Sequence, residues 1–230
     1  MSLPQSLSGP PAFLFDLDGT LVDSVYQHVL AWRDALEQAG LPLAVWRIHR
    51  RIGMSGGLFV NALARETGRS LGPEEVENIQ RLHIEAFRRY SPQVRPLPGA
   101  PELMAYLTKA SVPHAIATSG YQESARASVK TLGVGPNVPL VTRDQVAHAK
   151  PDPDLFLAAA ERLGVPVEHS VVVGDSIWDL LAARRARALG VGLLSGGYGE
   201  DELERAGAYR VYQDPADLLE HLDEVGVRVP

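Results

Sequence analysis

The chain has 230 residues, 45% of them hydrophobic and 22% charged, which is typical of a soluble globular protein with a sizeable core. Its formal net charge of -6 argues against a general nucleic-acid surface, which is normally basic. The absence of cysteine excludes disulfides, thiolate zinc sites and cysteine nucleophiles.

The N-terminal residues 1–11 are polar and proline-rich, without the basic start and apolar stretch of a signal peptide. No uninterrupted apolar run approaches the roughly 20 residues that span a bilayer. We therefore expect a cytoplasmic protein that has no membrane partner.

An apolar run at residues 13–15 is followed by Asp16, Asp18 and Gly19. The run predicts a short buried strand, and the glycine predicts the turn at which it ends. Residues two apart in an extended chain point the same way, so the two carboxylates converge at the C-terminal end of the strand. Such a pair resists full ionisation unless a cation lies between the carboxylates or one is protonated. The pair therefore indicates chemistry, although a solvated turn can have the same sequence.

The following residues, up to the boundary at residues 91–99, are predicted to form helices. Apolar spacing indicates helices at 23–39, 58–67 and 74–90, so residues 20–92 look wholly helical. The stiff segment at 91–99 holds three prolines and a glycine, and it is typical of a domain boundary.

Beyond this boundary, short apolar strands alternate with helices. The strands are expected at 114–117, 138–141, 171–173, 191–194 and 209–212, and the helices at 100–110, 121–132, 153–163 and 177–189. This alternation predicts an α/β fold, a Rossmann-like parallel sheet with helices on both faces. Strand 13–15 must belong to the same sheet, so we expect a core of residues 1–19 and 93–230 with an inserted helical cap at 20–92.

Polar residues follow three of these strands, where ligands bind in open parallel sheets. Thr118, Ser119 and Gly120 follow strand 114–117, and they are suited to cradle a phosphate at a helix N-terminus or, more simply, to cap that helix. Lys150 precedes Pro151, and it could neutralise a phosphoryl oxygen or lie at the surface.

Asp175 and Asp179 follow strand 171–173 at the start of a helix, where we expect them to share a face. Acidic residues in a first helical turn are often only caps. Their expected position beside Asp16 and Asp18 makes metal binding plausible, because magnesium prefers hard oxygen ligands. An EF-hand calcium loop is disfavoured, since its twelfth position would need Glu where this chain has Gln27.

Four motifs have now been described: Asp16 with Asp18, the segment Thr118 to Gly120, Lys150, and Asp175 with Asp179. They occur in the order and strand-end context of the four signatures of the haloacid dehalogenase superfamily, and they span almost the whole chain. The helical insert resembles the cap of the branch that includes phosphoglycolate phosphatases and β-phosphoglucomutases. The segment Gly196-Gly197-Tyr198-Gly199 resembles the phosphatases of that branch.

The resemblance implies magnesium-dependent hydrolysis of small phosphomonoesters, of the phosphoglycolate or sugar-phosphate type, through an aspartyl-phosphate. Asp16 would be the nucleophile and Asp18 the general acid and base. Mg²⁺ would be held by Asp16, the backbone carbonyl of Asp18 and Asp175, with Asp179 acting through a bound water. The residues implied to hold the phosphoryl group of the small phosphorylated metabolite are Thr118, Ser119, Gly120 and Lys150.

Three other functions remain to be weighed. Dehalogenases of the superfamily usually lack an aspartate at the position of Asp18, which this chain keeps. Receiver domains accept phosphate without turnover, but their acidic pair precedes the threonine and lysine, whereas Asp175 and Asp179 come last here. A pure interaction module is disfavoured because every expected site residue is present.

The choice between phosphatase and phosphoglucomutase depends on a few residues. His28 lies where the mutases carry a histidine that couples closure to proton transfer, and it could instead be a hinge or core residue. The mutases carry an acidic residue where Gly174 stands, and a cap arginine where this chain has Gly56. We therefore expect a phosphatase. Arg51, in the loop before Gly56, is a candidate substrate contact or a solvated arginine.

Overall fold

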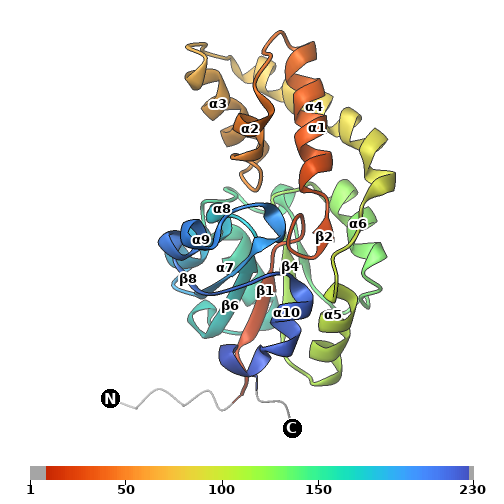
Figure 1. Cartoon of the computed structure of the whole chain (residues 1–230), viewed down its shortest axis with the longest axis vertical. Helices are drawn as coiled ribbons and strands as arrows, with labels where there is room; N and C mark the ends of the chain where they lie inside the picture. The colour runs from red at the N-terminus through yellow and green to blue at the C-terminus, as the bar shows by residue number, and fades with distance from the viewer. Residues whose placement is uncertain (1–8, 228–230) are drawn as a thin grey trace.

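The computed structural model describes residues 9–227 (Figure 1). Most of the N-terminal segment interpreted above, and the outermost residues of the predicted core at 1–8 and 228–230, lie outside the described residues.

A six-stranded parallel sheet forms the centre of the lower part of the molecule in Figure 1. Its strands, in spatial order, are β5 (Leu140–Val141), β4 (His114–Ala117), β1 (Ala12–Phe15), β6 (Ser170–Gly174), β7 (Leu189–Leu193) and β8 (Ala208–Tyr212). All five strand pairs are parallel. The predicted Rossmann-like sheet is confirmed, and β1 lies at its centre between β4 and β6.

Helices cover both faces of this sheet, because successive side chains of each strand point to opposite faces. Phe13 and Phe15 pack into a cluster with α5 (Ala100–Lys109) and α10 (Pro215–Glu220), whereas Leu14 packs against α7 (Asp154–Leu163) and α8 (Ile177–Ala186). The other two core helices are α6 (Gln122–Thr131) and α9 (Glu200–Ala206). Burial on both faces explains why the central strands are continuously apolar.

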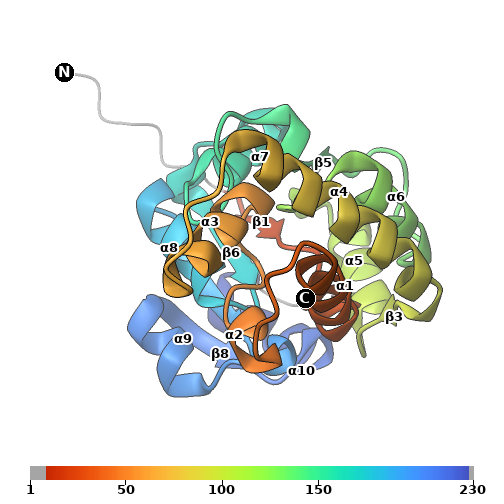
Figure 2. The same cartoon turned by 90° about the horizontal axis from the view of Figure 1, so that it is seen from above.

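A separate group of four helices, which we call the helical unit, lies over the end of the sheet (Figure 2). It consists of α1 (Val25–Gln38), α2 (Val45–His49), α3 (Gly56–Glu66) and α4 (Pro73–Tyr90). The unit has its own apolar cluster, in which Trp32, Phe59 and Ile79 are buried. Within residues 9–227, every helix is too short or too polar to cross a bilayer.

The structure corrects several details of the predicted secondary structure. Residues 20–92 are not wholly helical, since β2 (Val22–Asp23) pairs with β3 (Arg95–Pro96) in an antiparallel ribbon. Three short helices, α2, α9 and α10, were not predicted. A helix of five to seven residues shows too little apolar periodicity to be recognised in the sequence.

Candidate active site

The carboxyl ends of β4, β1 and β6 bring three of the predicted motifs together. Thr118 directly follows β4, Asp16 follows β1, and Asp175 follows β6. The three strands are adjacent and parallel, so their ends meet at one edge of the sheet. Lys150, in the segment before α7, reaches the same place, because its ammonium group donates to Asp16.

Three buried carboxylates form the most acidic part of the site. Oxygen atoms of Asp16, Asp175 and Asp179 all lie within 4.8 Å of one another. Lys150, which is fully buried, pairs with Asp16 and lies 2.8 Å from Oδ1 of Asp179. One ammonium group faces three carboxylates, so the cluster keeps excess negative charge. Hard oxygen ligands with this charge fit a metal cation.

The pKa values of this cluster show the same imbalance of charge. Burial raises the pKa of Asp16 to about 7, and the attraction of Lys150 offsets only part of this rise. Burial and the neighbouring charges of Asp179 and Asp16 raise the pKa of Asp175 well above its usual range. Burial alone would lower the pKa of Lys150, but the charges of Asp16 and Asp179 raise it instead. A cation bound among the carboxylates would favour their ionised forms.

Close packing around Asp175 and Asp179 depends on two glycines. A Cβ atom at Gly174 would lie 2.2 Å from the Cβ of Asp179, and one at Gly196 would lie 1.9 Å from Oδ2 of Asp175. Asp179 is in the first turn of α8, where its Oδ2 accepts from the backbone N–H of Ser176 at 3.2 Å. Asp175 precedes α8, so the prediction that the two aspartates share a helix face is wrong. The two side chains nevertheless approach one another, with oxygen atoms within 4.8 Å, and Asp175 also accepts from Thr20 at 2.8 Å.

Asp18 has different partners from Asp16, although only one residue separates them. Its Oδ1 accepts from Ser24 Oγ at 2.7 Å and lies 3.3 Å from Nε2 of His28. Its Oδ2 accepts from Thr118 Oγ1 at 3.4 Å. Burial would raise the pKa of Asp18, but the charge and hydrogen bond of His28 and the hydrogen bond of Ser24 lower it overall. The two aspartates are therefore pushed in opposite directions, which is a mark of groups with different roles.

His28 is itself held by His83, a residue that the sequence interpretation missed. Nδ1 of His28 and Nε2 of His83 are 3.2 Å apart. The ring of His28 stacks on Phe87 with a centroid distance of 4.0 Å, and His83 stacks on Trp32 at 3.9 Å. Burial and the neighbouring His28 keep the pKa of His83 well below its usual value, so His83 is neutral. The sequence did contain a signal for this group of rings. His28 and Trp32 lie four residues apart on α1, and His83 and Phe87 lie four residues apart on α4, so each pair shares one face of its helix.

The segment Thr118-Ser119-Gly120 faces the site, but Ser119 is not a helix cap. Helix α6 begins at Gln122, after an N-cap at Tyr121. The hydroxyl of Ser119 donates to the backbone carbonyl of Gly53 at 3.0 Å, while the N–H of Gly120 donates to Thr118 Oγ1 at 2.9 Å. Ser119 therefore connects the core to the helical unit.

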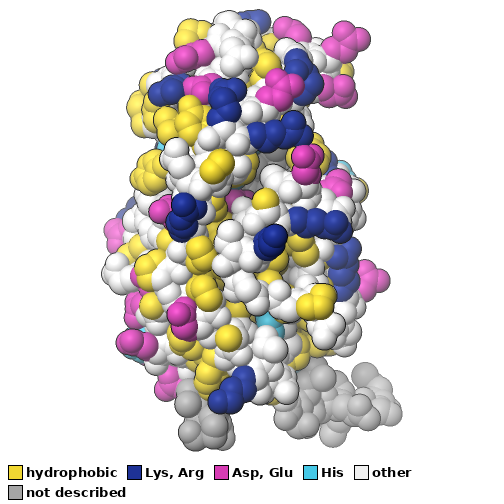
Figure 3. All heavy atoms as spheres, turned by 90° about the vertical axis from the view of Figure 1, so that its right-hand side faces the viewer, with side chains coloured by type: hydrophobic (Ala, Val, Ile, Leu, Met, Phe, Trp, Pro, Cys, Tyr) yellow, Lys and Arg dark blue, Asp and Glu magenta, His cyan; other side chains and the backbone are white. Residues whose placement is uncertain are grey.

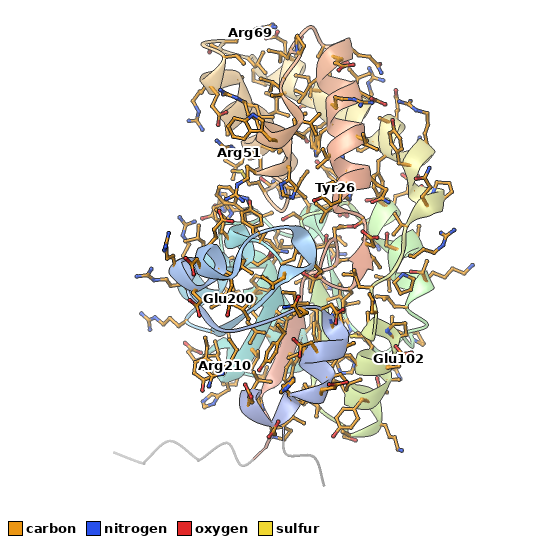
Figure 4. The ribbon with its side chains drawn as sticks, in the orientation of Figure 1. Tyr26, Arg51, Arg69, Glu102, Glu200 and Arg210 are labelled. Atoms are coloured by element: carbon orange, nitrogen blue, oxygen red, sulfur yellow. The ribbon has the colours of Figure 1, made fainter. Side chains whose placement is uncertain are left out.

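The loop between α2 and α3 reaches down from the helical unit onto the core. Gly53 has a φ of +95°, and a Cβ there would lie 2.7 Å from Ser176 Oγ. The N–H of Ser55 donates to the carbonyl of Lys150 at 3.2 Å. Arg51, the candidate substrate contact, is labelled in Figure 4. It lines the cavity above the aspartates, but its guanidinium group donates to Glu66 of α3.

Comparison with known proteins gives consistent matches. A family model described as haloacid dehalogenase-like hydrolase matches residues 10–187. The chain is 37% identical over 166 residues to hexitol phosphatase A of Escherichia coli, covering 71% of this chain and 74% of that protein. It is 31% identical over 218 residues to a phosphoglycolate phosphatase of Rhodospirillum rubrum, covering 91% and 89%. Among solved structures, a hydrolase from Pseudomonas syringae matches with a TM-score of 0.92 at 55% identity, covering 94% of this chain and 100% of that one.

The family match covers most of the sheet and the helical unit, and it includes Asp16, Asp18, Thr118, Lys150 and Asp175. The sequence resemblance is therefore confirmed by comparisons of both sequence and structure. The chain belongs to the haloacid dehalogenase-like hydrolase family.

Proposed function

We propose that this protein is a magnesium-dependent phosphatase that hydrolyses small phosphomonoesters through an aspartyl-phosphate. The observation that carries the proposal is that the neighbouring carboxylates of Asp16 and Asp18 have different partners. Asp16 lies against Lys150 in the buried acidic cluster, whereas Asp18 lies against His28 and Ser24 outside that cluster. The relatives named above include a hexitol phosphatase and a phosphoglycolate phosphatase.

Asp16 is proposed as the nucleophile that attacks phosphorus. Covalent catalysis of this kind divides one difficult displacement into two easier steps. Lys150 holds the Asp16 carboxylate in place and offsets negative charge on the phosphoryl oxygens. Thr118, Ser119 and Gly120 are proposed to donate hydrogen bonds to these oxygens, for which the Ser119 hydroxyl and the Gly120 N–H exchange their present acceptors, the Gly53 carbonyl and Thr118 Oγ1.

Asp18 is proposed as the general acid and base. It protonates the leaving alkoxide in the first step and deprotonates the attacking water in the second. Its hydrogen bonds to Ser24 and His28 fix its orientation toward the scissile bond, and His83 in turn holds His28. The lowered pKa of Asp18 favours its ionised form, which is the form that deprotonates water in the second step. The proton that Asp18 gives to the leaving alkoxide in the first step would come from the substrate's phosphate monoanion or from solvent.

The acidic cluster fits Mg²⁺, because it offers hard oxygen ligands in a buried site with too little positive charge. Asp16, the backbone carbonyl of Asp18 and Asp175 are the proposed ligands, with Asp179 acting through a bound water. When bound, the ion lowers the repulsion between an anionic carboxylate and an anionic phosphate.

We also propose that the chain is divided into two domains, a core at residues 1–19 and 93–230 and a cap at 20–92. The contacts of Ser119 with Gly53 and of Ser55 with Lys150 support a closed arrangement in which the cap excludes water from the site.

A phosphatase is preferred to a mutase for two structural reasons. The Cβ of an acidic residue at position 174 would collide with Asp179, so this site has no room for the mutase arrangement. Gly56 faces Gln80 and offers no cation for the distal phosphate of a bisphosphate. A protein that only accepted phosphate, without turning over a substrate, would have no use for the cap and the cavity.

The test is phosphate release from a panel of metabolite phosphates and p-nitrophenyl phosphate, with and without EDTA. We expect turnover that depends on magnesium and that disappears in Asp16→Asn, while circular dichroism shows an intact fold. Turnover of Asp16→Asn at the wild-type rate, or turnover unaffected by EDTA, would remove this mechanism.

A further inference from the structure

A cavity of about 250 Å³ lies between the core and the helical unit, and it opens onto Asp16 and Asp18. Its walls come from α1, α3 and α4, from the loop that contains Gly53, and from the start of α6. We infer that this cavity receives the leaving group of the ester, and that this group is bulky, uncharged and carries an apolar or aromatic face. The inference rests on the proposed phosphatase activity and names its substrate class.

Each arginine on the cavity wall already contacts a carboxylate of the protein. Of the described residues that line it, two are arginines, and neither is free. Arg51 donates to Glu66, which also accepts from Arg47 outside the wall at 3.3 Å. Arg88 donates to Glu123 across the junction of the helical unit and the core at 3.0 Å. Figure 3 shows basic and acidic side chains close together on this side of the molecule. A second anionic group on the substrate would therefore have to compete with Glu66 or Glu123 for these guanidinium groups.

The two histidines on the wall do not supply the missing positive charge. His28 is occupied by Asp18 on one side and by His83 on the other. His83 is neutral, because burial and His28 keep its pKa low. A carboxylate or a second phosphate in the cavity would lose part of its hydration and would meet only cations that a carboxylate of the protein already contacts, which is unfavourable.

Aromatic and aliphatic side chains form the rest of the wall. Trp32 stacks on Phe59 with a centroid distance of 4.1 Å and on His83 at 3.9 Å, so the three rings form a stack in this wall. Met54 and Ile84 extend the apolar wall. A wall of this kind takes up rings and aliphatic groups through the hydrophobic effect.

Polar groups gather at the outer rim of the cavity instead. The hydroxyl of Tyr121 in the core donates to Oε1 of Gln80 on α4 at 3.1 Å. Both residues are at the wall, so the far end of a leaving group can exchange hydrogen bonds with them. The pair of Tyr121 and Gln80 suits a neutral hydrogen-bonding group, such as a hydroxyl or an amide.

The test compares two esters of equal size, 4-carbamoylbenzyl phosphate and 4-carboxybenzyl phosphate. The leaving oxygen is the same in both, and only the charge at the far end differs. We expect kcat/KM for the carbamoyl ester to exceed that for the carboxylate ester by at least about tenfold, because the cavity cannot neutralise the carboxylate. A smaller ratio would overturn the inference.

One variant of Gln80 places a positive charge in the cavity, and a second variant controls for the change in its shape. In Gln80→Lys the ratio should fall by at least about tenfold relative to Gln80→Met, since both lose the contact with Tyr121 and only one adds a cation. An unchanged ratio in Gln80→Lys would show that the leaving group does not occupy the cavity, and would overturn the inference.

Arg51→Gln tests whether this arginine can leave Glu66 to bind an anion. We expect it to change kcat/KM for both esters by the same factor. A selective loss of the carboxylate ester would show that Arg51 supplies a cation, which contradicts the inference. If neither ester, nor p-nitrophenyl phosphate, releases phosphate with magnesium, then the proposed function itself fails.

Discussion

Replacing Lys150 by methionine would test the charge balance of the buried site. The ammonium group pairs with Asp16 and Asp179, and the side chain is fully buried. Removing one partner of a buried ion pair costs roughly 3–5 kcal/mol, because the remaining charge is left uncompensated. Methionine fills a similar volume, so little of this loss comes from packing. For a chain of this size, we expect a fall in Tm of about 6–20 °C at pH 8 without metal.

This destabilisation should depend on pH with a definite sign. The pKa of Asp16 is already about 7 with Lys150 present, and it rises further when the lysine is removed. Below that pKa the carboxyl group is protonated and neutral, so it no longer needs a cation. The difference in unfolding free energy between Lys150→Met and the wild type should therefore be largest at pH 8 and smaller at pH 5.

The assay is urea denaturation followed by circular dichroism, in EDTA, at both pH values. Lys109→Met, at an exposed position of α5, is the matched control and should stay within about 0.5 kcal/mol of the wild type. A loss below about 1 kcal/mol at pH 8, or an equal loss at both pH values, would refute the reasoning about the buried pair.

Three further predictions concern the metal, the proton donor and the cap loop. Magnesium should raise Tm more at pH 8 than at pH 5.5, because protons compete for a carboxyl group whose pKa is about 7; equal shifts would argue against Asp16 as a ligand. His28→Gln should slow hydrolysis of alkyl phosphates at least about tenfold more than that of p-nitrophenyl phosphate, since only a poor leaving group needs the proton from Asp18; a uniform slowing would assign His28 a purely structural role. Gly53→Ala should lower kcat/KM at least about tenfold, because its Cβ would lie 2.7 Å from Ser176 Oγ; Gly68→Ala, where φ is also positive but no atom lies within 4 Å, is the control, and equal effects would show strain alone.

The sequence was sufficient for the parts of the site that follow strands of the sheet. An apolar run that ends in polar residues predicts both the strand and the direction in which those residues face, so Asp16, Thr118 and Asp175 could be expected at one edge. The order of the elements along the chain was enough to predict that a helical segment is inserted after β1 and before the other strands of the sheet. These are local signals, and they do not depend on how the helices pack.

Contacts that form only when two helices pack could not be predicted in the same way. The approach of His83 to His28 depends on the packing of α4 against α1, and the pairing of Arg51 with Glu66 depends on the loop before α3. The two-residue ribbon of β2 and β3 also lacked a signal, because so short a strand shows no alternation. The sequence therefore predicted the residues at the strand ends more completely than the contacts of the helical unit around them.

The ribbon of β2 and β3 has a consequence for how this protein can evolve. Val22 pairs with Pro96, and Asp23 pairs with Arg95, so the chain enters and leaves the helical unit at adjacent points. An insertion whose ends already lie together adds little loop-closure entropy to the domain that carries it, whatever its length. The helical unit can therefore be exchanged for another insertion while the strands that carry Asp16 and Asp175 stay unchanged. Selection can alter the range of substrates through this segment and preserve the carboxylates at the strand ends, as long as the new segment also supplies partners for Asp18 where Ser24 and His28 now lie.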